Sequence, residues 1–147
     1  MTRVPGARQR GFTLIEIMVV VVIIGLLTAV VATNVLGRVD EARITKAKQD
    51  IQAIELALQM YRLDNSRYPS TEQGLQALVS QPTIEPVPIN WKAGGYIARA
   101  SKDPWKQEYI YASPGENGDY DLYSLGADQK EGGEGVDADI SNWNLDE

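Results

Sequence analysis

Five acidic side chains gather near the C-terminus and are the clearest candidates for metal chemistry. They lie in a glycine-rich stretch, residues 126–139: Asp128, Glu131, Glu134, Asp137 and Asp139. Carboxylate oxygens on a pliable loop suit calcium, which accepts about six to eight oxygen ligands in irregular geometry. The spacing departs from an EF-hand loop, because Lys130 stands where that loop needs an oxygen ligand. Composition alone leaves two interpretations open, a calcium loop and a solvated acidic loop.

A single carboxylate near the start of a long apolar run is the second chemical feature. Between Phe12 and Val35 the only charged residue is Glu16, and a basic leader ending at Gly11 precedes the run. Such a run forms a helix of about 36 Å, enough to cross a hydrocarbon layer of about 30 Å. An ionised group buried there costs on the order of 2.5–3.5 kcal/mol. We therefore expect Glu16 to meet a positively charged partner during assembly with other subunits.

The chain contains neither cysteine nor histidine. Disulfide frameworks, thiolate or imidazole metal sites and the Ser-His and Cys-His nucleophile pairs are therefore excluded. Its acids are scattered rather than paired for hydrolysis, so the sequence predicts a protein that is not an enzyme. The net charge is −6, and removal of the leader with its three arginines would make it −9. This acidic balance argues against binding to nucleic acid.

The elements that must carry these groups begin with one long helix. Ala47, Ile51, Ile54, Leu58 and Tyr61 recur at spacings of four and three residues, which predicts the apolar stripe of an amphipathic helix. No proline occurs between residues 5 and 69. We predict a helix from about residue 13 to about residue 64, apolar all round in its first half and one-sided in its second.

A small domain follows that helix. Ser70 or Thr71 is expected to cap a short helix over residues 72–79, and the prolines and glycines of residues 81–95 predict an irregular loop.

Residues 108–112 and 120–124 alternate with a period of two, and turn residues separate them, so we predict a β-hairpin. A lone hairpin is marginal in water and is expected to pack on the long helix. The predicted fold class is α+β.

Several motifs resemble a known family. The junction Gly11-Phe12-Thr13-Leu14-Ile15-Glu16 resembles the processing site of the type IV pilin and pseudopilin class. Further motifs resemble the major pseudopilins of type II secretion systems, and the match runs from Gly11 to about Asn144: Leu63-Asp64-Asn65, Tyr68-Pro69, Thr71-Glu72-Gln73-Gly74-Leu75, Asp103-Pro104-Trp105, Asp121 to Asp128, and Asp139-Ile140-Ser141-Asn142-Trp143.

The resemblance implies a role for each residue of the junction. A prepilin peptidase would cleave between Gly11 and Phe12 and methylate the new amine, so that Phe12 becomes N-methylphenylalanine. Glu16 would pair with the N-terminal amine of a neighbouring subunit. The family commonly has proline at the position of Thr33, so the resemblance leaves open whether the helix loosens there.

The resemblance also implies a cofactor, because major pseudopilins bind calcium in the corresponding loop. The implied ligands are the Leu125 carbonyl and the side chains of Asp128, Asp137 and Asp139. The two glutamates of the loop are expected to be solvated or outside the ligand set.

The implied domain organisation is a leader (1–11, removed), a transmembrane and assembly helix (12–35) and a periplasmic domain (36–147). Within that domain we expect the helix to about 64, a loop region (65–106), the hairpin (107–124) and the calcium loop (125–140). The leader's charges, Arg3, Arg8 and Arg10, are all basic, which predicts a single-pass inner-membrane protein with a cytoplasmic N-terminus.

The implied function is that of a structural subunit of the pseudopilus. Subunits would polymerise from the inner membrane into a periplasmic filament that helps drive folded exoproteins across the outer membrane. The implied partners are further copies of the chain, minor pseudopilins, the prepilin peptidase, the inner-membrane assembly platform and the secretin.

Two other functions remain as alternatives. One is a subunit of a type IV pilin-like surface fibre, although many such pilins use a C-terminal disulfide that this chain cannot form. The other is a secreted calcium-binding domain behind a conventional signal peptide, with Val30-Val31-Ala32 as its small-residue cleavage site.

Overall fold

A computed structural model of the chain describes residues 11–145, without the side chains of residues 30–36. The predicted leader, apart from Gly11, lies outside the described residues. The chain divides into two compact units, Met1–Val39 and Asp40–Glu147. They are described separately below.

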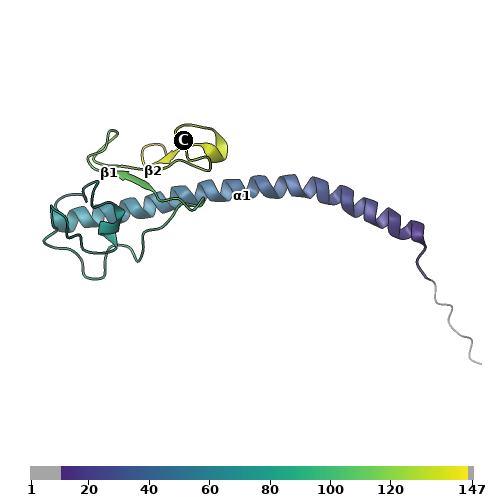
Figure 1. The fold of residues 1–147 in the computed structure, drawn as a ribbon, viewed down its shortest axis with the longest axis horizontal. Coiled ribbons are helices and arrows are strands. Elements are labelled where there is room, and N and C mark those ends of the chain that lie inside the picture. Colours follow the sequence, from purple (N-terminus) through teal and green to yellow (C-terminus); the bar gives the residue numbers. More distant parts are fainter. Residues whose placement is uncertain (1–10, 146–147) are drawn as a thin grey trace, which may run out of the picture. The chain divides into compact units, whose positions relative to one another are not determined.

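One helix, α1 (Leu14–Asn65), runs through both units (Figure 1). The predicted continuous helix is confirmed, to within one residue at each end. Its backbone is helical at Thr33 as elsewhere, because no proline removes a backbone hydrogen bond from the helix.

The apolar side chains at the start of the first unit are exposed to solvent. From Phe12 to Leu27 the large hydrophobic residues are between 46% and 80% exposed. Among the residues that the structure describes, no helix is long and apolar enough to cross a membrane.

In the second unit a small antiparallel sheet covers one face of α1 (Figure 1). Its strands are β1 (Ile110–Ala112), β2 (Asp121–Ser124) and β3 (Ile140–Ser141), in the order β1-β2-β3. Tyr111 pairs with Leu122 across β1 and β2, and Ser124 pairs with Ile140 across β2 and β3. The predicted hairpin is therefore confirmed, with both strands shorter than expected.

The core of this unit lies between the sheet and the predicted stripe of α1. The five stripe residues are all buried, Ala47, Ile51 and Leu58 completely. The inward-facing side chains of the sheet, Leu122 among them, pack against this stripe in the same cluster.

Two tyrosines at the edge of this core also bond to polar residues of α1. The Tyr109 hydroxyl donates to the Asp50 carboxylate at 3.2 Å, and the Tyr120 hydroxyl donates to the Glu55 carboxylate at 3.2 Å. Burial raises the pKa of the Glu55 carboxyl, and the hydrogen bond from Tyr120 partly offsets this. These bonds set the position of the hairpin along the helix.

The prediction of a short helix over residues 72–79 is wrong in its length. Only the 3₁₀-helix η1 (Leu75–Leu78) forms. Ser70 and Gln73 exchange the reciprocal bonds of a capping box, at 3.0 and 3.3 Å. Gly74 then has a φ of 57°. This left-handed conformation ends the turn that the cap begins, so no α-helix propagates.

Two further elements were not predicted, strand β3 and the 3₁₀-helix η2 (Gly135–Asp137). Neither is longer than three residues, so neither produces a periodic pattern in the sequence.

Two leucines of α1 provide a matched test of this core. Leu58→Ala is expected to lower the free energy of unfolding of the second unit by about 2–5 kcal/mol, because Leu58 is fully buried. Leu56→Ala removes the same atoms from a side chain that is 61% exposed, and is expected to change stability by less than about 0.5 kcal/mol. Denaturant unfolding of the full chain measures both, and equal losses would contradict the assigned core.

Candidate functional site

The predicted processing junction lies at the first turn of α1 and contains two reciprocal hydrogen bonds. The Thr13 hydroxyl accepts from the Glu16 backbone N–H at 3.3 Å, and the Glu16 carboxylate accepts from the Thr13 backbone N–H at 3.4 Å. This is a capping box, in which two otherwise unpaired backbone donors are satisfied reciprocally.

The capping box gives Glu16 a role that sequence reasoning missed. The signal was present, because Thr-Leu-Ile-Glu has the spacing of the motif. The carboxylate is also favoured there by the partial positive charge of a helix N-terminus. Both Thr13 and Glu16 are exposed. Glu16 is thus held near the predicted cleavage point, with its side chain exposed.

The acidic loop follows β2 and returns to β3, and backbone contacts close it. The Ala127 N–H donates to the Val136 carbonyl at 2.9 Å. Gly126 has a φ of 65°, and a β-carbon there would lie 2.8 Å from that carbonyl oxygen. Only glycine at position 126 allows the backbone there to approach residues 136–138 this closely. Residues 125–128 therefore lie beside residues 136–138.

Of the predicted calcium ligands, Leu125 and Asp128 lie on the first of these stretches, Asp137 lies on the second, and Asp139 follows the second directly. One Asp128 oxygen accepts from the Lys130 backbone N–H at 3.1 Å, and Oδ2 of Asp139 accepts from the Gly132 N–H at 2.9 Å. Asp137 lies in η2, facing Gly133. Within residues 11–145, no group of three or more acidic side chains is close enough together to hold a metal ion.

One atom of the loop nevertheless fits a cation. Oδ1 of Asp139 is buried and has no hydrogen-bond donor. Burying a carboxylate oxygen without a hydrogen-bond donor costs free energy, and a bound cation beside this atom would offset that cost. The hard oxygen donors of the loop suit calcium, and the ligand set remains a prediction.

A buried aspartate outside the predicted set anchors the start of the loop. Asp103 is 5% exposed, and Oδ1 accepts from the backbone N–H groups of Trp105 and Gln107 at 3.0 and 2.8 Å. Its other oxygen accepts from the Ser124 hydroxyl at 2.6 Å. Asp103 thus ties the turn before β1 to the end of β2, directly before Leu125. The Asp103-Pro104-Trp105 motif indicates a turn in the sequence, but it gives no sign of the hydrogen bond to the distant Ser124.

Comparison with protein families identifies two regions of the chain. Residues 6–32 match the prokaryotic N-terminal methylation motif. Residues 34–143 match the family described as type II secretion system (T2SS), protein G.

Individual relatives agree with the family match. The chain is 59% identical to the type II secretion system core protein G of Pseudomonas aeruginosa, over 92% of this chain and 96% of that protein. It is 56% identical to the protein of that name from Vibrio cholerae, over 94% of each chain. The crystal structure of the major pseudopilin from the type 2 secretion system of enterohaemorrhagic Escherichia coli matches with a TM-score of 0.65 and 47% identity, over 75% of this chain and 94% of that one.

The methylation motif, the long helix and the small α+β domain, taken together with these matches, define a pseudopilin, a structural subunit of the pseudopilus. The chain belongs to the type II secretion system protein G family.

Proposed function

We propose that the chain leaves the inner membrane and polymerises into a periplasmic filament that helps drive folded exoproteins across the outer membrane. The observation that carries this proposal is the accessible carboxylate of Glu16 at the first turn of α1, within the stretch that matches the methylation motif. The proposed role is structural and not catalytic.

Glu16 would change partners as the filament forms. In the single chain its carboxylate accepts from the Thr13 backbone N–H. Cleavage after Gly11 would create a positively charged amine on Phe12. In the filament, the Glu16 carboxylate would form an ion pair with this amine of a neighbouring copy. Each charge would be stabilised by assembly in an apolar surrounding, where an unpaired charge is costly. The pair would also set the axial register between subunits.

The proposed location is the inner membrane, crossed once by residues 12–35, with the N-terminus in the cytoplasm and the second unit in the periplasm. Long apolar side chains exposed along the described part of this segment support the proposal, since they suit lipid or neighbouring helices better than water. The proposed partners are the prepilin peptidase, minor pseudopilins, the inner-membrane assembly platform and the secretin.

Processing provides the first functional test. Gly11→Ala is expected to block cleavage, because the peptidase must accept a residue without a side chain beside the scissile bond. Mass spectrometry should find the wild type beginning at methylated Phe12 and the variant retaining its leader. A wild-type chain that begins near Thr33 would instead support the secreted calcium-binding alternative.

Two substitutions of Glu16 separate the capping role from the charge. Glutamine can serve in a capping box as glutamate does, but it carries no charge, whereas leucine removes both functions. Both Glu16→Gln and Glu16→Leu are expected to be cleaved normally yet to form few filaments, measured as sedimentable polymer. Normal filaments with Glu16→Gln and none with Glu16→Leu would assign Glu16 to helix capping alone.

We also propose that the acidic loop binds calcium through the Leu125 carbonyl and the side chains of Asp128, Asp137 and Asp139. The buried, unpaired Oδ1 of Asp139 supports this, as does the closure of the loop that brings residues 125–128 beside residues 136–138. A bound ion would draw the three carboxylates together, neutralise their charge and order a loop rich in glycine. Its role would be to stabilise the C-terminal part of the second unit.

Calcium removal tests this site. With calcium at a hundred times its dissociation constant, the free energy of unfolding is expected to rise by about 2.7 kcal/mol, equivalent to about 10 °C in Tm. Thermal unfolding of the full chain with calcium and with chelator measures the difference.

Two variants of the loop sharpen the calcium test. Asp139→Ala should unfold at the temperature of the chelated wild type in either condition, whereas Glu134→Ala, on the same loop, should respond to calcium as the wild type does. An unchanged wild-type Tm after chelation would leave these aspartates as solvated loop residues.

A further inference from the structure

The turn between β1 and β2 is organised by one buried carboxylate, that of Asp121, which is 6% exposed. Its Oδ1 accepts from the Asn117 backbone N–H at 3.1 Å, and its Oδ2 accepts from the Glu116 backbone N–H at 2.9 Å. The Asn117 side-chain amide also donates to Oδ2, at 3.2 Å. Three donors from two adjacent residues thus meet on this carboxylate and hold the turn closed.

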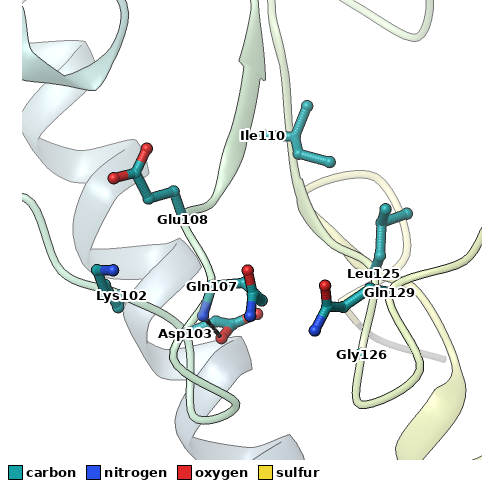
Figure 2. A pocket seen from close by; sticks show the side chains of 8 residues that line it. All are labelled: Lys102, Asp103, Gln107, Glu108, Ile110, Leu125, Gly126 and Gln129. Carbon is teal, nitrogen blue, oxygen red and sulfur yellow. Dashed lines mark hydrogen bonds between the residues drawn. The ribbon is translucent and has the colours of Figure 1, made fainter.

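The opposite end of the hairpin is held by a second buried carboxylate. Figure 2 shows the hydrogen bond that Asp103 accepts from the Gln107 backbone N–H, shortly before β1. The other Asp103 oxygen accepts from Ser124 at the end of β2. Because the two ends have separate anchors, a chemical change at the turn can loosen the Asp121 end and leave the Asp103 end closed.

Asn117 is followed by a residue that leaves its side chain unobstructed. Asn117 and Gly118 are both exposed, and they are the only Asn-Gly pair of the chain. In the part of the chain that the structure describes, the Gly118 N–H donates to no protein acceptor. A β-carbon built on Gly118 would meet only the Tyr120 carbonyl oxygen, at 3.9 Å. The Gly118 nitrogen is therefore free to lose its proton and to approach the Asn117 side chain.

We propose that Asn117 is a site of spontaneous deamidation, and that the product loosens the turn held by Asp121. The Gly118 nitrogen gives up its proton to hydroxide and bonds to Cγ of Asn117, and the Cγ–Nδ2 bond breaks with release of ammonia. Water then opens the succinimide ring at either carbonyl, which yields aspartate or isoaspartate. Glycine hinders this ring closure least, because it has no β-carbon.

Either product changes the environment of Asp121. The side-chain donor of Asn117 is lost, and a second carboxylate takes its place near a buried one, where like charges repel. Isoaspartate also adds one methylene group to the backbone between residues 117 and 118. Both changes weaken the hydrogen bonds that the Glu116 and Asn117 backbone N–H groups donate to Asp121, so the turn is expected to open more often.

Mass spectrometry of the full chain tests the modification. After incubation at mildly alkaline pH, trypsin releases residues 107–130, in which Asn117 is the only asparagine. In this peptide the wild type is expected to accumulate the mass change of an NH₂-to-OH exchange, together with isoaspartate.

Gly118→Ala is the matched control for this reaction. Gly118 does not have a left-handed φ, and an added β-carbon fits the folded turn. The same β-carbon hinders the approach of the nitrogen to Cγ, so the variant is expected to deamidate at least about tenfold more slowly than the wild type.

Two substitutions of Asn117 measure the effect of the product on the turn. Asn117→Asp introduces the second carboxylate, whereas Asn117→Ala removes only the side-chain donor. Hydrogen exchange of the backbone amides of residues 116 and 117 is expected to be at least about tenfold faster in Asn117→Asp than in Asn117→Ala, because only Asn117→Asp brings like charges together. Exchange of the Gln107 amide, which donates to Asp103, should be equal in the two variants.

Three results would contradict the proposal. If the folded wild type keeps its Asn117 amide while the urea-unfolded chain loses it, the hydrogen bond to Asp121 protects the side chain and the folded protein has no such site. Equal rates in the wild type and in Gly118→Ala would overturn the proposed ring closure. Equal amide exchange in Asn117→Asp and Asn117→Ala would overturn the loosening of the turn.

Discussion

Burial of one face of α1 is the interaction on which the second unit depends. The sheet is too short to be stable alone, since its three strands are at most four residues long. The stripe that includes Ile51 and Leu58 gives it a surface to pack against, and the hydrogen bonds of Tyr109 and Tyr120 to α1 hold it in place. The helix thus serves as the structural support of the domain and as the element that begins at the predicted processing site.

Two surface loops of this domain are anchored by side-chain hydrogen bonds. Asp103 joins the turn before β1 to Ser124, so the acidic loop starts from a rigid position. The loop that contains Ile89 is likewise fixed to the last turn of α1. One loop contains a buried carboxylate oxygen without a hydrogen-bond donor, and the other holds an apolar side chain in solvent.

The first turn of α1 combines a local and an intermolecular requirement in one residue. Glu16 completes a capping box with Thr13, which satisfies backbone donors before assembly. The same carboxylate is the counter-charge proposed for a neighbouring amine. A helix N-terminus can serve both purposes because its partial positive charge keeps a carboxylate close without burying it.

The sequence by itself determined the features that arise from local pattern. The buried stripe of α1 and the hairpin depend on spacings of two to four residues, and the length of α1 follows from the absence of proline between residues 5 and 69. The capping motif at Thr13 and Glu16 also has a local spacing, although its role was recognised only in the structure. Family membership likewise followed from short motifs at the junction and in the domain, and the comparisons confirmed it. Only the tertiary structure decided that residues 72–74 form no α-helix, that β3 closes the sheet, that Asp103 meets Ser124, and that Ile89 projects from a fixed loop. These depend on contacts between residues far apart in the chain, or on the conformation of a single glycine, and neither leaves a periodic trace in the sequence.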